Sequence, residues 1–294
     1  MVVGHTSIPS FLSNYIFSFH MPLFFIISGI LFRKDKISDF CSLVRHKVLT
    51  LLLPYLFFLL CTIVYKAVWN FDIGFELMFG NGVGALWFLY ILFFTEIINA
   101  IFISKLTNQQ YFCVALVLSL IGYLFYIYDI HFVYKIEVCC LATLFFCIGY
   151  TFKYYVFNIK IESVAILFLM FISSFLLSLL IPRLDMNHNQ YGSYLPNILA
   201  AIGGTLVVVV VSKKIESLNI TNVFRKFLIW AGKNSIVIVG LSQVINMSLK
   251  YCLSYTQLPR IVSMPIQHIL LWLSLMLFSY LLNKYAPILI GKKR

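Results

Sequence analysis

The sequence predicts an all-α protein, a polytopic bundle of transmembrane helices. Of its 294 residues, 62% are hydrophobic and 11% are charged, which is too little polar surface to cover a water-soluble globule of this size. Apolar segments of about 17 to 25 residues recur along the chain, the length that crosses roughly 30 Å of hydrocarbon as a helix. The short alternating strands of an outer-membrane barrel do not occur in this sequence. We therefore expect a single integral membrane domain over residues 1–294.

The sequence predicts nine whole spans, preceded by the tail of another helix. Residues 1–9 read as the end of an apolar helix, because a span needs about 20 residues and only four residues precede His5. We therefore expect the chain to lack the front of its first helix, so that the complete bundle would have ten helices. The whole spans are expected at residues 14–32, 47–68, 84–104, 110–128, 136–152, 160–182, 194–212, 229–249 and 263–283.

The basic residues predict the orientation, because Lys and Arg near span ends are retained on the cytoplasmic side. If the spans alternate and residues 33–47 form a cytoplasmic loop, 17 of the 22 basic residues lie on that side and 5 on the other. The expected location is the plasma (inner) membrane, with the C-terminus in the cytoplasm. The formal charge of +12 therefore reflects topology, and nucleic acid is not an expected partner.

Two of the predicted external loops, residues 69–83 and 183–193, are polar and rich in turn residues. The second contains Asp185, His188 and Asn189. Such loops can form a surface that binds a polar ligand outside the cell, and ordinary exposed turns have the same composition. Both interpretations stay open from the sequence.

Polar groups inside the predicted spans mark candidate sites, because they are costly in hydrocarbon. His20 lies close to Pro22, which frees a backbone carbonyl one turn earlier; the imidazole can carry protons, or it can satisfy the freed carbonyl. Glu96 can line a site, or it can make an interhelical hydrogen bond that fixes packing. Trp87 opens a span on the predicted external side, where an aromatic belt is the alternative to a site.

Four segments carry a resemblance to a known family. In chain order they read SFHMPLFFIISGILFRKD, RHKVLTLLLPYLFF, GALWFLYILFF and LIWAGKNSIVIV. In this order and at these separations they resemble the integral membrane acyltransferase-3 family, and within it the branch of fucose 4-O-acetylase-like and surface-polysaccharide O-acetyltransferases. The likeness extends from His5 to about Gln243. The first segment is specific, and the other three are supporting evidence.

The resemblance implies a membrane O-acyltransferase. The expected reaction takes an acyl group, acetyl in particular, from cytoplasmic acyl-CoA and delivers it to a hydroxyl of a cell-surface or lipid-linked glycan. Acetyl-CoA is then a co-substrate, and no bound cofactor or metal is expected. The alternative is a flippase or exporter of a polysaccharide or of its lipid-linked precursor, because intramembrane polar groups and a multi-span bundle suit both. An exporter has no need of a basic face that binds CoA.

The resemblance also implies roles for individual residues. His5 matches the family's catalytic histidine in the first helix, and His20, on the next span, is the second candidate base. Arg33 matches a basic residue expected on the acyl-CoA side. Trp87 matches the family's tryptophan, and Ser242 stands about where many relatives have a histidine.

The chemistry fits these residue types independently of the resemblance. Transfer from a thioester to an alcohol needs a base, and neutral imidazole titrates in the right range. The phosphates of CoA need cations, and residues 33–47 supply five, among them Arg33, Arg45 and Lys47. The sequence has no Gly-x-Ser-x-Gly elbow and no Cys–His pairing, so we expect direct transfer without a covalent acyl-enzyme.

Overall fold

The computed structural model describes residues 9–68, 84–159, 163–217, 222–256 and 259–292. Within these residues the regular elements are helices, and eight of them are long and apolar enough to cross a membrane. A shorter apolar helix, α8 (Val164–Leu180), accounts for the remaining predicted span. The all-α bundle of transmembrane helices is therefore confirmed.

The chain divides into two compact units. Among the described residues, the first unit takes in residues 9–43 and those between Ile91 and Arg225, and the second takes in those between Val44 and Tyr90 and from Lys226 to residue 292. The division falls within three helices: α2 (Phe40–Lys47), α5 (Trp87–Lys105) and α10 (Asn222–Lys233).

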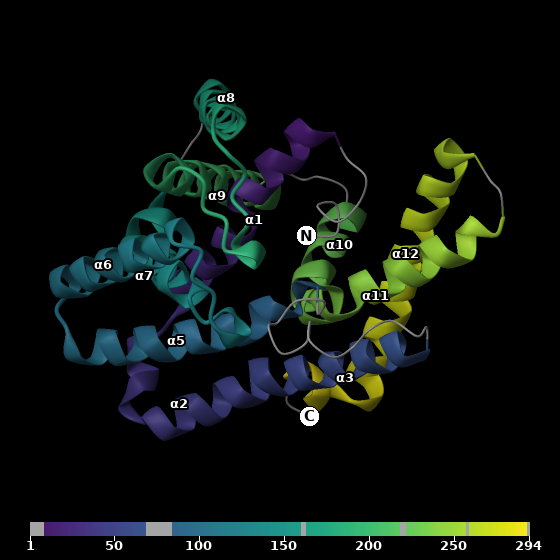
Figure 1. Ribbon diagram of the computed structural model, residues 1–294, viewed down its shortest axis with the longest axis horizontal. Helices are drawn as coiled ribbons and strands as arrows, with labels where there is room; N and C mark the ends of the chain where they lie inside the picture. Colours follow the sequence, from purple (N-terminus) through teal and green to yellow (C-terminus); the bar gives the residue numbers. More distant parts are fainter. Residues whose placement is uncertain (1–8, 69–83, 160–162, 218–221, 257–258, 293–294) are drawn as a thin grey trace. The chain divides into compact units, whose positions relative to one another are not determined.

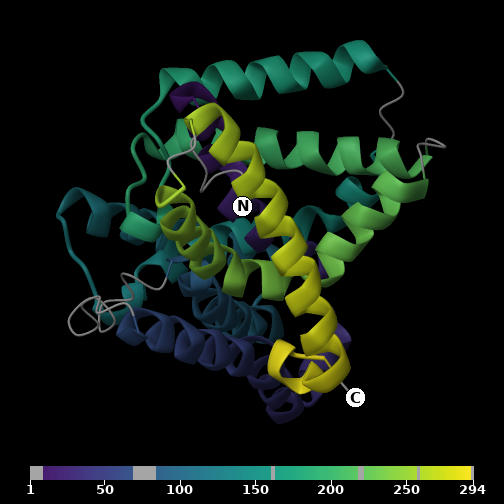
Figure 2. The same ribbon diagram turned by 90° about the vertical axis from the view of Figure 1, so that its right-hand side faces the viewer.

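The first unit is built around α1 (Ser10–Leu31) and α7 (Val138–Asn158). α1 packs against α7 and α9 (Tyr194–Ser217), and α6 (Asn108–Ile127) packs against α7 (Figure 1). α8 lies along α9, as Figure 2 shows from the side. The unit thus surrounds α1, the helix that carries His20.

Two glycines allow α1 and α7 to approach each other closely. A Cβ at Gly29 would lie 2.1 Å from the carbonyl oxygen of Phe146, and a Cβ at Gly149 would lie 2.0 Å from that of Ile26. Small residues are common where membrane helices meet, because lipid tails are as apolar as the side chains and close backbone packing drives association. This contact fixes the position of α1, and with it His20, against α7.

Lys213 of α9 caps the end of α7. Its ammonium donates hydrogen bonds to the carbonyl oxygens of Val156 and Phe157 at 2.7 Å each, and a longer one to Ile159 at 3.5 Å. The last carbonyls of a helix have no partner within the helix, and a cation suits that end of the helix dipole. Lys213 therefore ties the end of α7 to α9.

The second unit contains α3 (Leu53–Val68), α11 (Ser235–Ser254) and α12 (Arg260–Tyr285), with the short helices η4 (Gly84–Leu86) and η7 (Pro287–Ile290). α11 packs against α12, α3 and η4, and η7 packs against α3 and α12 (Figure 1). A Cβ at Gly240 of α11 would lie 2.3 Å from the ring of Phe58 in α3. A glycine is needed at this contact as well.

Two details of the sequence prediction are wrong. Residues 33–47, expected as a loop, are mostly helical: η2 (Lys34–Ser38) is followed by α2, which continues through a π-helical turn, η3 (Val48–Leu52), into α3. The span expected at residues 229–249 is divided into α10 and α11 by Asn234, whose φ of −113° and ψ of 18° leave the helix. Hydropathy averaged over a span does not detect a single non-helical residue.

Candidate functional site

The structure describes seven of the predicted site residues. His20, Arg33 and Glu96 belong to the first unit, and Arg45, Lys47, Trp87 and Ser242 belong to the second. His5 and the predicted external loop at 69–83 lie outside the described residues.

His20 is buried in α1, with 7% of its surface exposed. Its Nδ1 lies 3.0 Å from the carbonyl oxygen of Ile16. Pro22 deprives the carbonyl of Ser18 of its helical partner, so this contact of His20 does not satisfy the carbonyl that the proline frees. Because a carbonyl only accepts, the contact places a proton on Nδ1, so that in the neutral ring Nε2 is the basic nitrogen.

Two side chains connect His20 to the turn at 183–193. The ring of Phe17 packs edge-on against the His20 ring, with centroids 4.7 Å apart. The guanidinium carbon of Arg183 lies 3.4 Å from the Phe17 centroid, a cation–π contact. Nη2 of Arg183 lies 3.4 Å from Oδ2 of Asp185. One ring and one guanidinium therefore separate the imidazole from the turn.

Residues 129–137 and 181–194 lie together and are called here the polar end of the first unit. Nζ of Lys135 donates to the backbone carbonyl of Asn187 at 2.5 Å and to its side-chain oxygen at 2.9 Å. These bonds join segments about 50 residues apart in sequence. Lys135 is only 7% exposed, so this lysine holds the polar end together from within.

The turn at 185–190 is fixed by its backbone. Asp185 and Gln190 exchange two backbone hydrogen bonds, at 2.8 and 2.9 Å. The Asp185 carboxylate accepts from the backbone N–H of Asn187 at 3.1 Å and lies 3.1 Å from Nδ1 of His188. Asp185 is 8% exposed and Asn189 2% exposed, so this is not an ordinary exposed turn.

Glu96 of α5 is 5% exposed and accepts a hydrogen bond from the Ser28 hydroxyl of α1 at 2.5 Å. This is the interhelical bond that the packing interpretation expects. One turn further along α5, Asn99 donates to the carbonyl of Thr95 at 2.7 Å and accepts from the Tyr111 hydroxyl of α6. Asn99 is unusual in the sequence as a polar residue within a predicted span, but its partner Tyr111 could not be identified, because a tyrosine in an apolar span looks like an ordinary aromatic residue.

Arg33 follows the end of α1 and is exposed. Its guanidinium lies 2.8 Å from the Asp35 carboxylate, and the hydrogen bond and charge of Asp35 raise the pKa of Arg33. Exposed ion pairs contribute little to stability, because water and salt screen them. Arg33 therefore keeps its charge and can exchange Asp35 for a phosphate oxygen.

Trp87 and Ser242 are both buried in the second unit, at 3% and 5% exposure. The burial of Trp87 argues against a lipid-facing aromatic belt at this position. The two segments meet at Gly84, where a Cβ would lie 1.6 Å from Oε1 of Gln243. The structure thus brings the start of α5 beside the turn of α11 that carries Ser242.

Lys292 is held by two asparagines in the second unit. Its ammonium donates to Oδ1 of Asn283 at 2.6 Å and to Oδ1 of Asn234 at 3.2 Å. Asn283 also donates to Oδ1 of Asn234 at 2.8 Å. Burial lowers the pKa of Lys292, and the nearby positive charge of Lys233 lowers it further.

The same region includes the end of α2. A Cβ at Gly291 would lie 2.8 Å from the carbonyl oxygen of Thr50. Thr50 lies about one helical turn after Lys47, and the exposed Arg45 lies two residues before Lys47. We call Arg45, Lys47, Lys233 and Lys292 the basic end of the second unit. Lys233 and Lys292 were not predicted as site residues, because their closeness depends on the packing of distant segments.

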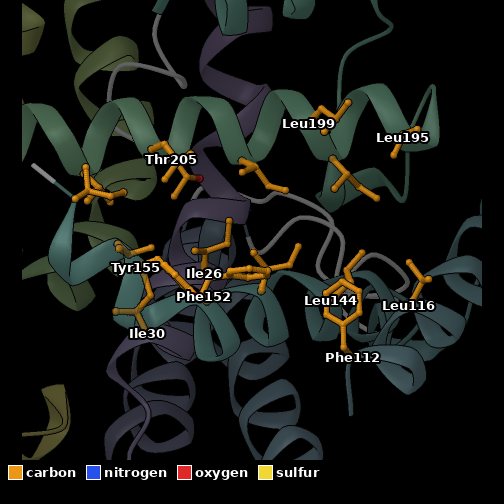
Figure 3. Close-up of a pocket in the computed structure, with 18 of the residues that line it drawn as sticks. Ile26, Ile30, Phe112, Leu116, Leu144, Phe152, Tyr155, Leu195, Leu199 and Thr205 are labelled. Carbon is orange, nitrogen blue, oxygen red and sulfur yellow. The ribbon is translucent and has the colours of Figure 1, made fainter. Parts of the chain in front are cut away.

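A cavity of about 560 Å³ opens between α1, α6, α7 and α9 of the first unit (Figure 3). Its lining includes Ile26, Leu116, Leu144, Phe152 and Leu199, and almost all of its surface is hydrocarbon. Burying phosphate or sugar hydroxyls against such a surface would leave them without hydrogen bonds. The cavity therefore suits apolar groups rather than phosphates or sugar hydroxyls.

A family model for an acyltransferase domain matches residues 1–284. The match takes in nearly the whole chain and all of the predicted site residues. Searches of curated proteins and of solved structures found no match. The chain therefore belongs to the acyltransferase-3 family, and it is an acyltransferase of groups other than amino-acyl groups, with multiple membrane-spanning helices.

Proposed function

We propose that this protein is a membrane-bound O-acyltransferase that moves an acetyl group from cytoplasmic acetyl-CoA to a hydroxyl of a cell-surface or lipid-linked glycan. The observation that carries this proposal is the position of His20. Its ring is buried, its Nε2 is the basic nitrogen, and Phe17 and Arg183 connect it to the polar end of the first unit.

The reaction needs a base that can hold one proton for a short time. An imidazole takes the proton of the acceptor hydroxyl while the hydroxyl oxygen attacks the thioester carbonyl carbon. The tetrahedral intermediate collapses, the C–S bond breaks, and the thiolate of CoA receives the same proton. The products are an ester and CoA with a free thiol. The resemblance assigns this base to His5, and His20 is the candidate whose surroundings are described.

The cations supply the binding of the donor. The exposed Arg33 and the basic end of the second unit are two separate candidates for binding the phosphates of CoA, because charge-assisted hydrogen bonds to phosphate are strong. The proposed orientation, in which these groups face the cytoplasm, follows from the excess of basic residues on one side of the predicted spans.

Export of a polysaccharide remains the contrasting activity. Family membership favours acyl transfer, and a deletion strain separates the two in cells. Mass spectrometry should find surface polymer of normal length with fewer acetyl esters. Polymer that is retained inside the cell with its esters intact would instead support export.

The direct test uses purified protein in liposomes with radiolabelled acetyl-CoA and the acetyl-free glycan of the deletion strain. Label is expected to enter the glycan as an ester that mild base releases, at a rate that depends on protein concentration. A folded protein that binds acetyl-CoA and labels neither the polysaccharide nor its lipid-linked precursor would overturn the proposal.

A further inference from the structure

α10 is too short to be a membrane span. Its 12 residues make a helix of about 18 Å, well short of the roughly 30 Å of hydrocarbon. The helix that follows, α11, is by itself long and apolar enough to cross the membrane. The non-helical φ and ψ of Asn234 separate the two helices, and Figure 1 shows them meeting at an angle. The crossing at α11 therefore does not need α10.

One side of α10 is apolar and the other is basic. At about 100° per residue, its apolar residues other than Ile229 cover roughly 160° of the helix. We call them the apolar side of α10: Val223, Phe224, Phe227, Leu228, Trp230 and Ala231. Arg225, Lys226 and Lys233 lie on the opposite side, together with Ile229, and the helix contains no acidic residue. This is the pattern of a helix that lies in the plane of a membrane surface.

Protein covers only part of the apolar side. Phe227 stacks on Trp230 with ring centroids 5.9 Å apart, and it packs edge-on against Trp272 of α12 at 5.3 Å. The large residues that stay exposed are Val223 at 78%, Phe224 at 46% and Leu228 at 40%. Leaving such side chains in water costs free energy in proportion to their exposed apolar area. The exposed part of the apolar side therefore indicates contact with an apolar medium.

The basic side indicates the charge of the surface that provides this medium. Arg225 and Lys226 are exposed, and no carboxylate of the described residues forms an ion pair with either of them. Anionic phospholipids attract basic residues beside a membrane, and each basic residue raises the affinity about fivefold. A bilayer that contains such lipids presents hydrocarbon and negative charge next to each other, as the two sides of α10 require.

We propose that α10 lies in the membrane surface and binds anionic phospholipid. Its apolar side contacts the acyl chains, and Arg225 and Lys226 hydrogen-bond the phosphates of the headgroups. The excess of basic residues on one side of the predicted spans assigns this surface to the cytoplasmic leaflet. The inference goes beyond the proposed function and does not depend on it, because binding of lipid needs no acyl transfer.

Asn234 connects α10 to the basic end of the second unit. Its backbone N–H and its Nδ2 both donate to the carbonyl of Trp230, at 3.0 and 2.9 Å. Its Oδ1 accepts a hydrogen bond from Lys292 at 3.2 Å. A lipid contact that holds α10 in place therefore also holds the asparagine that positions Lys292.

Two neighbouring cysteine substitutions test the position of α10. Phe224→Cys places a thiol on the apolar side, and Arg225→Cys places one on the basic side. The proteins are treated in open membrane sheets with a charged maleimide, which does not enter hydrocarbon, and mass spectrometry of the labelled peptide distinguishes the new thiol from the native cysteines. We expect Arg225→Cys to react about tenfold faster than Phe224→Cys, or more. After unfolding in dodecyl sulfate the two should react equally.

A second test removes the charges. The protein in a neutral detergent is titrated with phosphatidylglycerol or phosphatidylcholine while its melting temperature is measured, because a ligand that binds only the folded protein raises this temperature. Phosphatidylglycerol should raise it for the parent more than phosphatidylcholine does. The double variant Arg225→Gln, Lys226→Gln should need roughly 25-fold more phosphatidylglycerol for the same rise.

Two matched double variants serve as controls for this titration. Lys105→Gln with Lys284→Gln removes two exposed charges from other helices, and it should follow the parent. Arg225→Lys with Lys226→Arg keeps both charges on α10, and it should also follow the parent. Lys233 is left unchanged throughout, because it belongs to the basic end of the second unit.

Other results would overturn the proposal. Equal labelling of the two cysteines in membrane sheets would show α10 standing in water, and protection of both would show it buried in protein. Protection of Phe224→Cys that grows with protein density would assign the apolar side to a second copy of the chain. An equal loss of the lipid response in the Lys105 and Lys284 control would show attraction to net charge alone. A parent that meets these expectations but transfers no acetyl group would refute the proposed function and leave this inference standing.

Discussion

The hydroxyl of Ser28 donates a 2.5 Å hydrogen bond to Oε1 of Glu96, joining α1 to α5 within the first unit. If the main role of Glu96 is this bond, an amide that keeps the accepting oxygen should replace the carboxylate. We expect Glu96→Gln to retain the parent melting temperature and acyl transfer within about tenfold of the parent rate. Glu96→Ala should destabilise the protein by about 1 to 3 kcal/mol, because it leaves the serine unpaired. A rate lowered a hundredfold or more in a stable Glu96→Gln protein would instead assign Glu96 to the chemistry.

Gly149 offers a test of the contact between α1 and α7. A Cβ there would lie 2.0 Å from the carbonyl oxygen of Ile26. A backbone oxygen cannot move away by a change of rotamer, as a side-chain atom can. Gly149→Ala should therefore destabilise the protein by about 1 to 3 kcal/mol, measured by thermal unfolding in detergent. Gly232→Ala in α10 is the matched control, because nothing lies within 4 Å of its added Cβ, and it should be neutral or slightly stabilising. Equal effects of the two changes would contradict the close packing.

The two candidate bases can be separated by substitution. Removing a general base lowers the rate about 10²- to 10⁴-fold, and we expect a loss of this size from His20→Ala or from His5→Ala, with protein level and CoA binding retained. His268 of α12 is the control, because its Nδ1 makes the same contact with a carbonyl one turn back, at 2.8 Å to Met264; His268→Ala should stay near the parent rate. If both variants transfer the acyl group within about tenfold of the parent rate, the base is another group. If a variant protein fails to accumulate, the histidine has a packing role instead.

Lys292 should act on the phosphates of the donor. Lys292→Ala is expected to raise the KM for acetyl-CoA roughly fivefold and to leave the KM for S-acetylpantetheine, which lacks the nucleotide, unchanged. The pKa of Lys292 is lowered, so its charge is lost at a lower pH than that of an ordinary lysine. In the parent protein, the KM for acetyl-CoA should rise as the pH increases through the lowered pKa of Lys292. In Lys292→Ala this rise should be absent. Lys284→Ala, at an exposed lysine of α12, is the control, and an equal shift for both thioesters would contradict a phosphate contact.

The orientation can be read from reporter fusions. The excess of basic residues on one side predicts that Arg294 is cytoplasmic and that the turn at 183–193 is external. A reporter active only in the cytoplasm should work at the first position and fail at the second. The same result at both positions would end the alternating topology and, with it, the assignment of an external acceptor.

The sequence located the spans well because hydrocarbon thickness imposes both length and composition on them. It could not locate the break at Asn234, since one residue with non-helical φ and ψ leaves the average hydropathy unchanged. It also took residues 33–47 as a loop, because a short basic helix and a loop have similar compositions. The orientation and the role of His5 remain predictions.

The site was predictable only where polarity is unusual for its position. His20, Glu96 and the turn at 183–193 were identified in this way. The partners of Lys292 were not, because Asn234 lies 58 residues away in sequence, and only the packing of α10, α11 and α12 brings them together. The burial of Asn189 was equally hidden, because an asparagine in a turn is ordinarily exposed.

The unbroken helix from Phe40 to Val68 has a mechanical consequence. At 29 residues it is about 43 Å long, so roughly two turns exceed the hydrocarbon thickness of about 30 Å. Arg45 and Lys47 lie near the first end of this helix, which continues into α3, so any tilt of α3 would move both charges with it. The π turn at Val48–Leu52 holds one residue more than an α turn would. Removing a residue there would preserve the angular phase between the charges and the packed face of α3, whereas removing one elsewhere in this helix would turn the charges by about 100°.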